Sequence, residues 1–276
     1  MRRKITELFS VLLLLALWTA PLKAQTNEAS AADISPLLEE IRSKYDLPAL
    51  AAAVVRADGT IAEGAVGVRV KGRPERVTLK DRFHLGSTAK SMTATMIATL
   101  VEEGKLSWET TLAQVFPELG DKLHPTLRAV TLAQLLTHRA GITPFEDEEE
   151  PTWKQLPKFK GSPTKVRLAF TEWMLRRGAA SPVGEYVYSN AGYCLAAAMA
   201  ERVTGKSWES LMRERLFKPL GLRSAGFGWP ARDHAHEPWG HQEIKGELTP
   251  HSPRDVYQLP PYIAPAGDVH MSIGDF

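Results

Sequence analysis

Cysteine is almost absent from the sequence, and neither sign of charge dominates it. The single cysteine of the 276 residues, Cys194, excludes an internal disulfide and a cysteine-rich zinc site. Its neighbours are apolar, so we expect a buried, inert thiol rather than a nucleophile. The net charge of +2 gives no reason to expect a nucleic-acid partner. Hydrophobic and charged fractions of 43% and 24% exclude a disordered, collagen-like or coiled-coil chain.

The apolar run near the N-terminus is too short to cross a membrane. It covers residues 8–18, about half of the roughly 20 residues that a spanning helix needs. It follows a basic start at residues 1–4 and precedes Ala24, a small residue before a polar one. This order is typical of a secretory signal peptide. We therefore expect cleavage after Ala24, no stable membrane anchor afterwards, and a secreted or periplasmic domain over residues 25–276.

Hydrophobic periodicity predicts a β-hairpin followed by helices. Residues 50–55 and 61–70 favour strands, and Asp58-Gly59 between them indicates a tight hairpin turn. A helix is expected before the hairpin over residues 33–46, with Ile34, Leu37, Leu38 and Ile41 along one side. Further helices are predicted at 88–103, 131–138, 164–177, 190–204 and 207–217. No long periodic segment follows Gly221, so the fold class is α+β.

Residues 144–165 differ from the rest of the chain. They contain an acidic run at 146–150, followed by several lysines and prolines. A solvated loop insertion explains this composition better than a partner-binding segment does.

Ser87-Thr88-Ala89-Lys90 places a hydroxyl and an amine three residues apart at the start of a predicted helix. Side chains at that spacing share one helix face, and the first turn offers free backbone N–H groups that favour developing negative charge. A neutral amine there takes the proton of the hydroxyl, and an ammonium lowers the cost of an alkoxide. The alternative is that Ser87 only caps the helix. The local pattern leaves both interpretations open.

The same spacing occurs a second time, at Ser162 and Lys165. Pro163 follows this serine at the first helical position, and the surrounding segment is charged. We therefore expect Ser162 to be an ordinary helix N-cap.

Tyr188-Ser189-Asn190 precedes another predicted helix and has two interpretations. Structurally, Asn190 is a good N-cap and Tyr188 a half-buried aromatic residue. Functionally, Tyr188 is a second proton-transfer group and Asn190 a donor to a substrate carbonyl. Taken alone, the tripeptide favours the structural interpretation.

A series of ordered motifs resembles the serine β-lactamase and penicillin-binding family, in its class C-like branch with D-aminopeptidases and esterases. They include Phe-His-Leu-Gly-Ser-Thr-Ala-Lys-Ser at 83–91, Leu-Leu-Thr-His-Arg-Ala-Gly at 135–141 and Tyr-Ser-Asn-Ala-Gly-Tyr at 188–193, with further matches at 103–106, 216–222, 238–241 and 265–276. The resemblance implies an antiparallel sheet flanked by helices, together with an all-helical region. It also raises the functional interpretation of both short motifs above the capping one.

The resemblance implies a role for each matching residue. Ser87 is the acylated nucleophile, Lys90 holds and relays its proton, Tyr188 is a general base or proton shuttle, and Asn190 binds the substrate amide. The expected substrate is a small molecule or peptide with an amide or ester bond, such as a β-lactam, a D-amino acid peptide or a small ester. The expected chemistry uses no metal and no cofactor, and the backbone N–H of Ser87 supplies half of the oxyanion hole.

One motif of the family is missing from the sequence. The family carries Lys or His, then Thr or Ser, then Gly, on a strand lining the site, and no such tripeptide occurs here. In relatives that strand follows the segment resembling 265–276. We therefore expect the C-terminal sheet strands to be missing, the domain to be incomplete, and this chain by itself to be a poor catalyst. Loss of one oxyanion donor typically costs about a hundredfold or more in rate.

Two alternatives follow from the same sequence. The missing motif suggests a catalytically impaired or binding-only relative with the same fold. A minor alternative is a zinc site at His234, His236 and His241, with Asp233 and Glu237 nearby.

Overall fold

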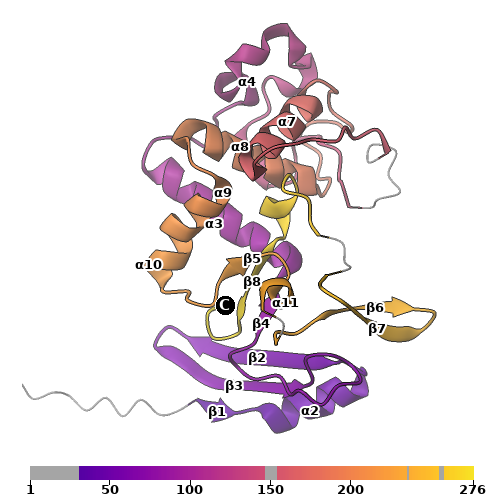
Figure 1. Ribbon diagram of the computed structural model, residues 1–276. Helices are drawn as coiled ribbons and strands as arrows, with labels where there is room; N and C mark the ends of the chain where they lie inside the picture. Colours follow the sequence, from indigo (N-terminus) through magenta and orange to yellow (C-terminus); the bar gives the residue numbers. More distant parts are fainter. Residues whose placement is uncertain (1–30, 147–153, 235, 255–257) are drawn as a thin grey trace, which may run out of the picture.

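The computed structural model describes residues 31–146, 154–234, 236–254 and 258–276 (Figure 1). The predicted signal peptide at 1–24 lies outside these ranges. No helix among the described residues is long and apolar enough to span a membrane. A sheet with one covering helix lies at one end of the molecule, a short sheet lies in the middle, and a helical region forms the other end (Figure 1).

The predicted hairpin forms the first sheet. β2 (Ala49–Arg56) and β3 (Gly59–Gly67) pair antiparallel. The turn lies at Ala57-Asp58, one residue before the predicted position, because Gly59 already pairs with Arg56. β1 (Ala32–Asp33) pairs with β3 in parallel, so the strand order is β1-β3-β2. The predicted hairpin itself is confirmed.

The first helix, α2 (Ser35–Lys44), packs against β3 and buries Leu38. It starts later than the predicted residue 33, because Asp33 is still extended in β1 and its carboxylate accepts a hydrogen bond from the Ser35 N–H at 2.8 Å. Leu37 and Ile41 are 55% and 38% exposed. Only part of the predicted apolar side is therefore covered by the described residues.

A second, central sheet brings distant parts of the chain together. β4 (Arg82–His84), β8 (Val269–Ser272) and β5 (Gly226–Phe227) pair antiparallel in the order β4-β8-β5. All four residues of β8 are buried. Because β4 leads directly into the segment that holds Ser87, this sheet anchors the start of the site.

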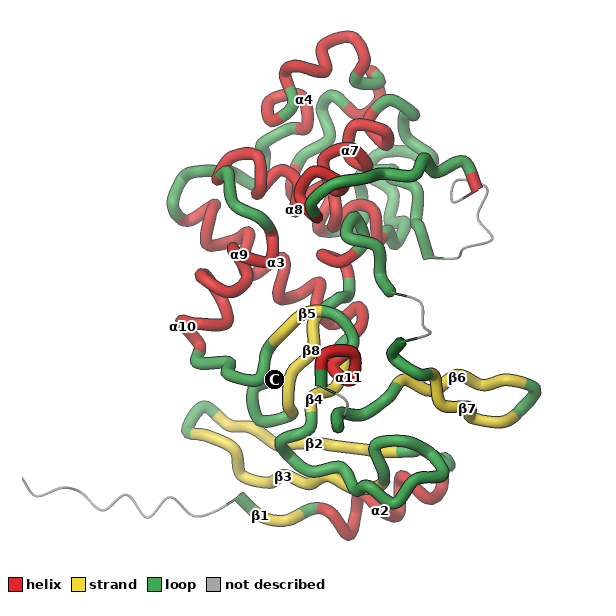
Figure 2. The backbone as a smooth tube through the Cα atoms, viewed as in Figure 1, coloured by secondary structure: helices red, strands yellow, loops and turns green. Residues whose placement is uncertain are grey.

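The region after Gly221 contains more structure than the sequence predicts. α11 (Pro230–Asp233) is followed by the hairpin of β6 (Gly240–Ile244) and β7 (Glu247–His251), which projects to one side of the molecule (Figure 2). The absence of periodicity there reflects short elements rather than irregular chain.

The helical region confirms the remaining predicted helices. Its α-helices are α3 (Ala89–Glu102), α4 (Leu112–Val115), α5 (Leu132–Leu136), α7 (Pro163–Leu175), α8 (Asn190–Thr204), α9 (Trp208–Met212) and α10 (Lys218–Leu220). The predicted helix at 207–217 is divided, because a π-helical turn at Arg213–Phe217 follows α9. Short 3-10 turns lie at Gly86–Thr88, Pro117–Lys122, Pro125–Leu127 and Ala264–Ala266.

The core lies between α3 and α8. Met96, Ile97 and Leu100 of α3 are fully buried, and α8 is buried continuously from Ala191 to Glu201. The alanines of α8 have small side chains, and α3 packs against this helix. The packing places the N-terminal ends of these two helices beside one another, and both ends carry predicted site residues.

A buried ion group joins the helices behind the core. Arg167 of α7 is fully buried, and its Nη2 lies 2.8 Å from Glu201 Oε1 and 3.0 Å from Glu209 Oε2. Its Nη1 donates to the carbonyl oxygen of Pro261 at 2.6 Å. An arginine at this depth needs such partners, because an uncompensated buried charge is strongly destabilising.

The predicted charged insertion at 144–165 is covered only in part. Its residues 147–153 lie outside the described ranges. Among the others, Phe145 is buried in the core and α7 already begins at Pro163. The insertion as a whole stays a prediction.

Candidate active site

Ser87 lies in the 3-10 turn Gly86–Thr88 that leads into α3, and its side chain is exposed. Neither this turn nor α3 has a side-chain capping hydrogen bond at its N-terminus. The hydroxyl instead meets Lys90 and Tyr188. The capping interpretation of Ser87 is therefore wrong, and the residue is placed for contact with a ligand from solvent.

Lys90 lies one helical turn further on and is only 6% exposed. Its Nζ donates hydrogen bonds to Ser87 Oγ at 3.0 Å, Asn190 Oδ1 at 2.7 Å and the carbonyl oxygen of Ala266 at 2.8 Å. Three acceptors match the three N–H groups of an ammonium. The nitrogen also lies 4.8 Å from the centre of the Tyr188 ring, within cation–π distance. The amine is thus fixed against the Ser87 hydroxyl.

Tyr188 reaches the same hydroxyl from the segment before α8. Its OH donates to Ser87 Oγ at 2.8 Å, and the residue is half-buried. Ser87 Oγ therefore has two proton-transfer groups within hydrogen-bond distance, one from each helix N-terminus.

Asn190 is the first residue of α8 and does not cap it. Ser189 is the N-cap, because its Oγ accepts from the Gly192 N–H at 3.0 Å. The Asn190 side chain instead accepts from Lys90 at 2.7 Å and donates from Nδ2 to the carbonyl oxygen of Phe145 at 2.8 Å. The capping interpretation of Asn190 is therefore wrong. In this arrangement its amide orients Lys90.

The carbonyl oxygen of Ala266 completes the lysine site, and the sequence did not identify it. It belongs to a short turn, Ala264–Ala266, held against α3 by the Thr93 Oγ1 hydrogen bond to the Pro265 carbonyl oxygen at 2.8 Å. A backbone carbonyl has no side-chain signature, so no motif in the sequence marks it.

The turn that presents Ser87 is braced from the central sheet. His84 Nδ1 accepts from the Gly86 N–H at 3.3 Å, and His84 Nε2 lies 3.2 Å from Asp268 Oδ1. The His84 ring also stacks on Trp229, with ring centres 4.3 Å apart. These contacts fix the backbone immediately before the nucleophile.

The other candidate residues behave as structural groups. Ser162 caps α7 by accepting from the backbone N–H of Lys165 at 3.4 Å, as predicted. Cys194 is fully buried, its Sγ donates to the carbonyl oxygen of Asn190 at 3.2 Å, and burial raises the pKa of its thiol well above the ordinary value. Both predictions are confirmed.

The zinc interpretation gains no support from the side chains involved. The Glu237 carboxylate accepts from the backbone N–H and the Nε of Arg82, both at 2.7 Å, and His241 Nε2 accepts from the Lys71 N–H at 3.0 Å. Within the described ranges no three His, Cys, Asp or Glu residues are grouped so that they could hold a metal ion.

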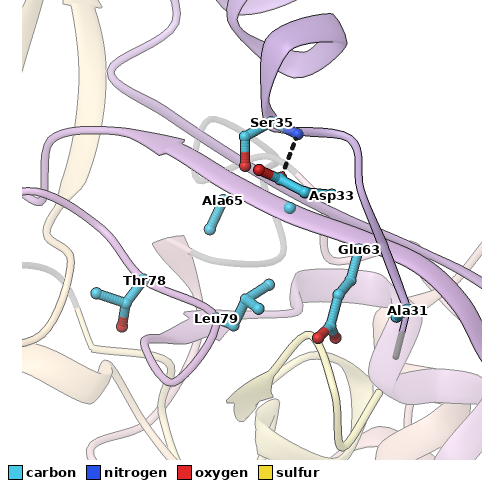
Figure 3. Close-up of a pocket in the computed structure, with 8 residues that line it drawn as sticks. Ala31, Asp33, Ser35, Glu63, Ala65, Thr78 and Leu79 are labelled. Atoms are coloured by element: carbon cyan, nitrogen blue, oxygen red, sulfur yellow. Dashed lines mark hydrogen bonds between the residues drawn. The ribbon is translucent and has the colours of Figure 1, made fainter. Parts of the chain in front are cut away.

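A separate hollow of about 350 Å³ lies against β1 and β3 (Figure 3). Its polar side chains include Asp33, Ser35, Glu63 and Thr78, and it shares no lining residue with the Ser87 site. The Asp33 carboxylate is already used by the Ser35 N–H, as the dashed line in Figure 3 shows.

Comparison with known proteins decides the family. Residues 32–276 match the family described as Beta-lactamase. The chain belongs to the beta-lactamase family. This membership confirms the predicted fold class, an α+β fold of the β-lactamase type.

Two curated relatives illustrate the similarity. Penicillin-binding protein 4 of Amycolatopsis lactamdurans is 32% identical over 68% of this chain and 46% of its own length. The Beta-lactamase of Escherichia coli K12 is 26% identical over 87% of this chain and 58% of its own length. The chain thus spans about half the length of these relatives.

Solved structures show the same fold. The octameric penicillin-binding protein homologue from Pyrococcus abyssi matches 87% of this chain and 53% of its own, with 25% identity and a TM-score of 0.67. The D-amino acid amidase of Ochrobactrum anthropi, at 22% identity and a TM-score of 0.65 over 86% of this chain and 64% of its own, shares the fold.

Proposed function

We propose that the protein is a serine hydrolase that works through an acyl-enzyme on Ser87 and cleaves amide or ester bonds. The observation that carries the proposal is the position of the Ser87 hydroxyl, with Lys90 Nζ at 3.0 Å and Tyr188 OH at 2.8 Å. An exposed serine between a buried amine and a phenol matches the general arrangement of an activated nucleophile.

The proposed reaction has two steps that use the same groups. First, one member of the Lys90–Tyr188 pair releases a proton to solvent. Ser87 Oγ then forms a bond to the substrate carbonyl carbon while its own proton passes to that deprotonated group. The carbon–nitrogen or carbon–oxygen bond then breaks, and the leaving group takes that proton. In the second step water attacks the ester carbonyl carbon, and the proton of the water passes through the Lys90–Tyr188 pair to Ser87 Oγ. The bond between Oγ and the carbonyl carbon breaks, and the acid product leaves. No metal or cofactor enters either step.

The relatives support the bond class but leave the substrate open. The matches include proteins named Beta-lactamase and Lovastatin esterase. We therefore propose a small molecule or peptide carrying an amide or ester carbonyl, whether a β-lactam, a D-amino acid peptide or a small ester.

A catalytically impaired, binding-only protein is the second candidate. The contacts of Ser87 with Lys90 and Tyr188 account for acylation, and they are equally compatible with slow release of the acyl group. Such a protein acylates at Ser87 but releases the acyl group very slowly.

One set of kinetics separates the candidates. The wild type, Ser87→Ala and the matched control Ser162→Ala are given a chromogenic β-lactam, an activated ester and a D-amino acid amide. Hydrolysis by the wild type and Ser162→Ala, lost in Ser87→Ala, supports the hydrolase. A burst of one product per protein without turnover supports the binding-only candidate, and Ser87-independent hydrolysis contradicts both.

We further propose that the protein is exported. The basic start and short apolar run of residues 1–24 support export. Mass spectrometry of protein recovered from the periplasm or medium should give an N-terminus at Gln25, whereas an intact leader in the cytoplasm would contradict it.

A further inference from the structure

His138 occupies an unusual backbone position at the end of α5. Its φ is +60°, in the left-handed region that side chains rarely adopt. The His138 N–H donates to the Leu135 carbonyl oxygen at 3.4 Å, and the Arg139 N–H donates to the Gln134 carbonyl oxygen at 2.8 Å. This pair of bonds is the Schellman motif, in which the left-handed residue is usually glycine.

Glycine adopts this conformation without strain, whereas a residue with a Cβ costs about 1 kcal/mol or more there. The end of α5 therefore does not need an imidazole. A strained residue next to a reactive group calls for another explanation, and the contacts of the His138 side chain supply one.

His138 contacts three consecutive residues of the segment that carries the reactive phenol. Its carbonyl oxygen accepts from the Val187 N–H at 2.9 Å. Its ring lies against the Tyr188 ring, with centres 4.5 Å apart and planes inclined by 32°. Its Nδ1 accepts from the Ser189 N–H at 3.1 Å. The histidine thus fixes the backbone on both sides of Tyr188 and one face of its ring.

The residues that follow Tyr188 are tied to the same corner. The Tyr193 OH donates to the Leu136 carbonyl oxygen at 3.0 Å, and its ring centre lies 5.3 Å from that of His138. The Ser189 Oγ donates to the Thr143 carbonyl oxygen at 2.8 Å. Within this corner the Tyr188 OH donates to Ser87 Oγ at 2.8 Å.

The bond from the Ser189 N–H requires a particular form of the ring. Nδ1 accepts a hydrogen bond only when it carries no proton, so the neutral ring has its proton on Nε2. Burial, and then the nearby Lys90 charge, lower the pKa of His138 below the ordinary value of 6.5. An N–H donor at Nδ1 favours the unprotonated nitrogen. The titratable groups that face the ring are Lys90 of α3, Tyr186 and Tyr188 of the preceding segment, and Tyr193 of α8.

We propose that His138 is a positioning residue that holds the Tyr188 hydroxyl on Ser87. The inference rests on the proposed function, because the role of His138 is exerted on the acylation of Ser87. His138 touches neither Ser87 nor the reacting atoms, so it acts on the rate of acylation rather than on substrate binding.

The test replaces His138 by the residue that its backbone prefers. His138→Gly relieves the left-handed strain and removes the ring, so the protein should stay folded, with its thermal midpoint changed by only a few degrees. Acylation of Ser87 by a fluorophosphonate probe, followed by mass spectrometry, should slow by roughly ten- to a hundredfold, as expected for a displaced reacting group. In a Tyr188→Phe background the same substitution should have little further effect.

His138→Asn is the matched conservative variant. Asparagine tolerates a positive φ, and its side-chain oxygen offers the Ser189 N–H an acceptor that does not titrate. It should recover part of the rate. We expect the wild-type rate to fall as the pH drops below 6.5, because protonation of His138 breaks the bond from Ser189, and His138→Asn should lack this fall.

The outcomes separate the inference from the proposed function. Unchanged acylation in His138→Gly, or an equal loss in the Tyr188→Phe background, overturns the positioning role. If the wild type is not labelled at Ser87 at all, the proposed function fails. In that case a crystal structure of His138→Gly still decides the inference. Tyr188 OH remaining at hydrogen-bond distance from Ser87 Oγ overturns it, and a displaced phenol supports it.

Discussion

Replacing Lys90 by methionine should slow the acylation of Ser87 strongly while changing stability only modestly. Methionine has a similar length but donates no hydrogen bond. The substitution leaves Asn190 Oδ1 and the Ala266 carbonyl oxygen without the donor they have at 2.7 and 2.8 Å. An unsatisfied buried acceptor costs about 1–3 kcal/mol, so the two lower the free energy of unfolding by about 2–6 kcal/mol.

Removal of the buried ammonium stabilises the protein by an amount similar to the cost of the two unsatisfied acceptors. Lys90 is 6% exposed, and burying an ammonium costs several kcal/mol that methionine does not incur. The two effects nearly cancel, and we expect a net change within about 3 kcal/mol in urea denaturation. The reaction has no such compensation. Loss of a group that moves the Ser87 proton should slow acylation by about 10²–10⁴-fold, equivalent to about 3–5 kcal/mol in the barrier.

The second Ser-x-x-Lys provides the control. Lys165→Met removes an exposed side chain, and the Ser162 cap uses only the backbone N–H of residue 165. This variant should match the wild type in stability and in the rate at which a fluorophosphonate labels Ser87. A Lys90→Met protein that remains folded and is labelled within threefold of the wild-type rate would refute the assignment of Lys90.

Three further predictions concern the scaffold. Glu201→Ala should lower the free energy of unfolding by about 3–5 kcal/mol, because it leaves buried Arg167 incompletely paired. Urea denaturation should show no comparable loss for the exposed Glu214→Ala, and equal losses would contradict the buried-pair explanation. Burial lowers the pKa of His270, so the unfolded chain binds its proton first and stability should decrease as the pH falls below 6.5. Thermal midpoints of the wild type and His270→Gln, measured between pH 8 and 5, should converge toward low pH, and parallel curves would argue against this. Cys194 should react with a thiol reagent only in denaturant, because burial raises its pKa; rapid modification of the folded protein would show the thiol to be accessible.

The helices and the first hairpin were predictable because their signals are local. Gly104 and Gly205 follow α3 and α8 with φ near +70°, the left-handed conformation that ends a helix. Asp58-Gly59 likewise marks the hairpin, because Gly59 follows the turn with a φ of +135° that favours glycine. The spacing of Ser87 and Lys90 is local too, since one helical turn places their side chains together.

The remaining features depend on contacts between distant residues. β4 pairs Arg82 with Ser272, and the β6–β7 hairpin includes Pro250 and several charged residues, which weakens any strand pattern. Tyr188 meets Ser87 across a gap of 101 residues, which the family resemblance indicated but periodicity alone did not. The left-handed backbone of His138 has no signal in the sequence, because the usual indicator of that conformation is glycine.

The most direct test of the account is the site of covalent modification. The wild type, Ser87→Ala and Ser162→Ala would each be incubated with a fluorophosphonate and with a penicillin, digested, and mapped by peptide mass spectrometry. The account predicts an adduct on the peptide containing Ser87 in the wild type and in Ser162→Ala, and none in Ser87→Ala. An adduct that persists in Ser87→Ala, or a folded wild type that neither reagent modifies, would contradict the role of Ser87 as nucleophile.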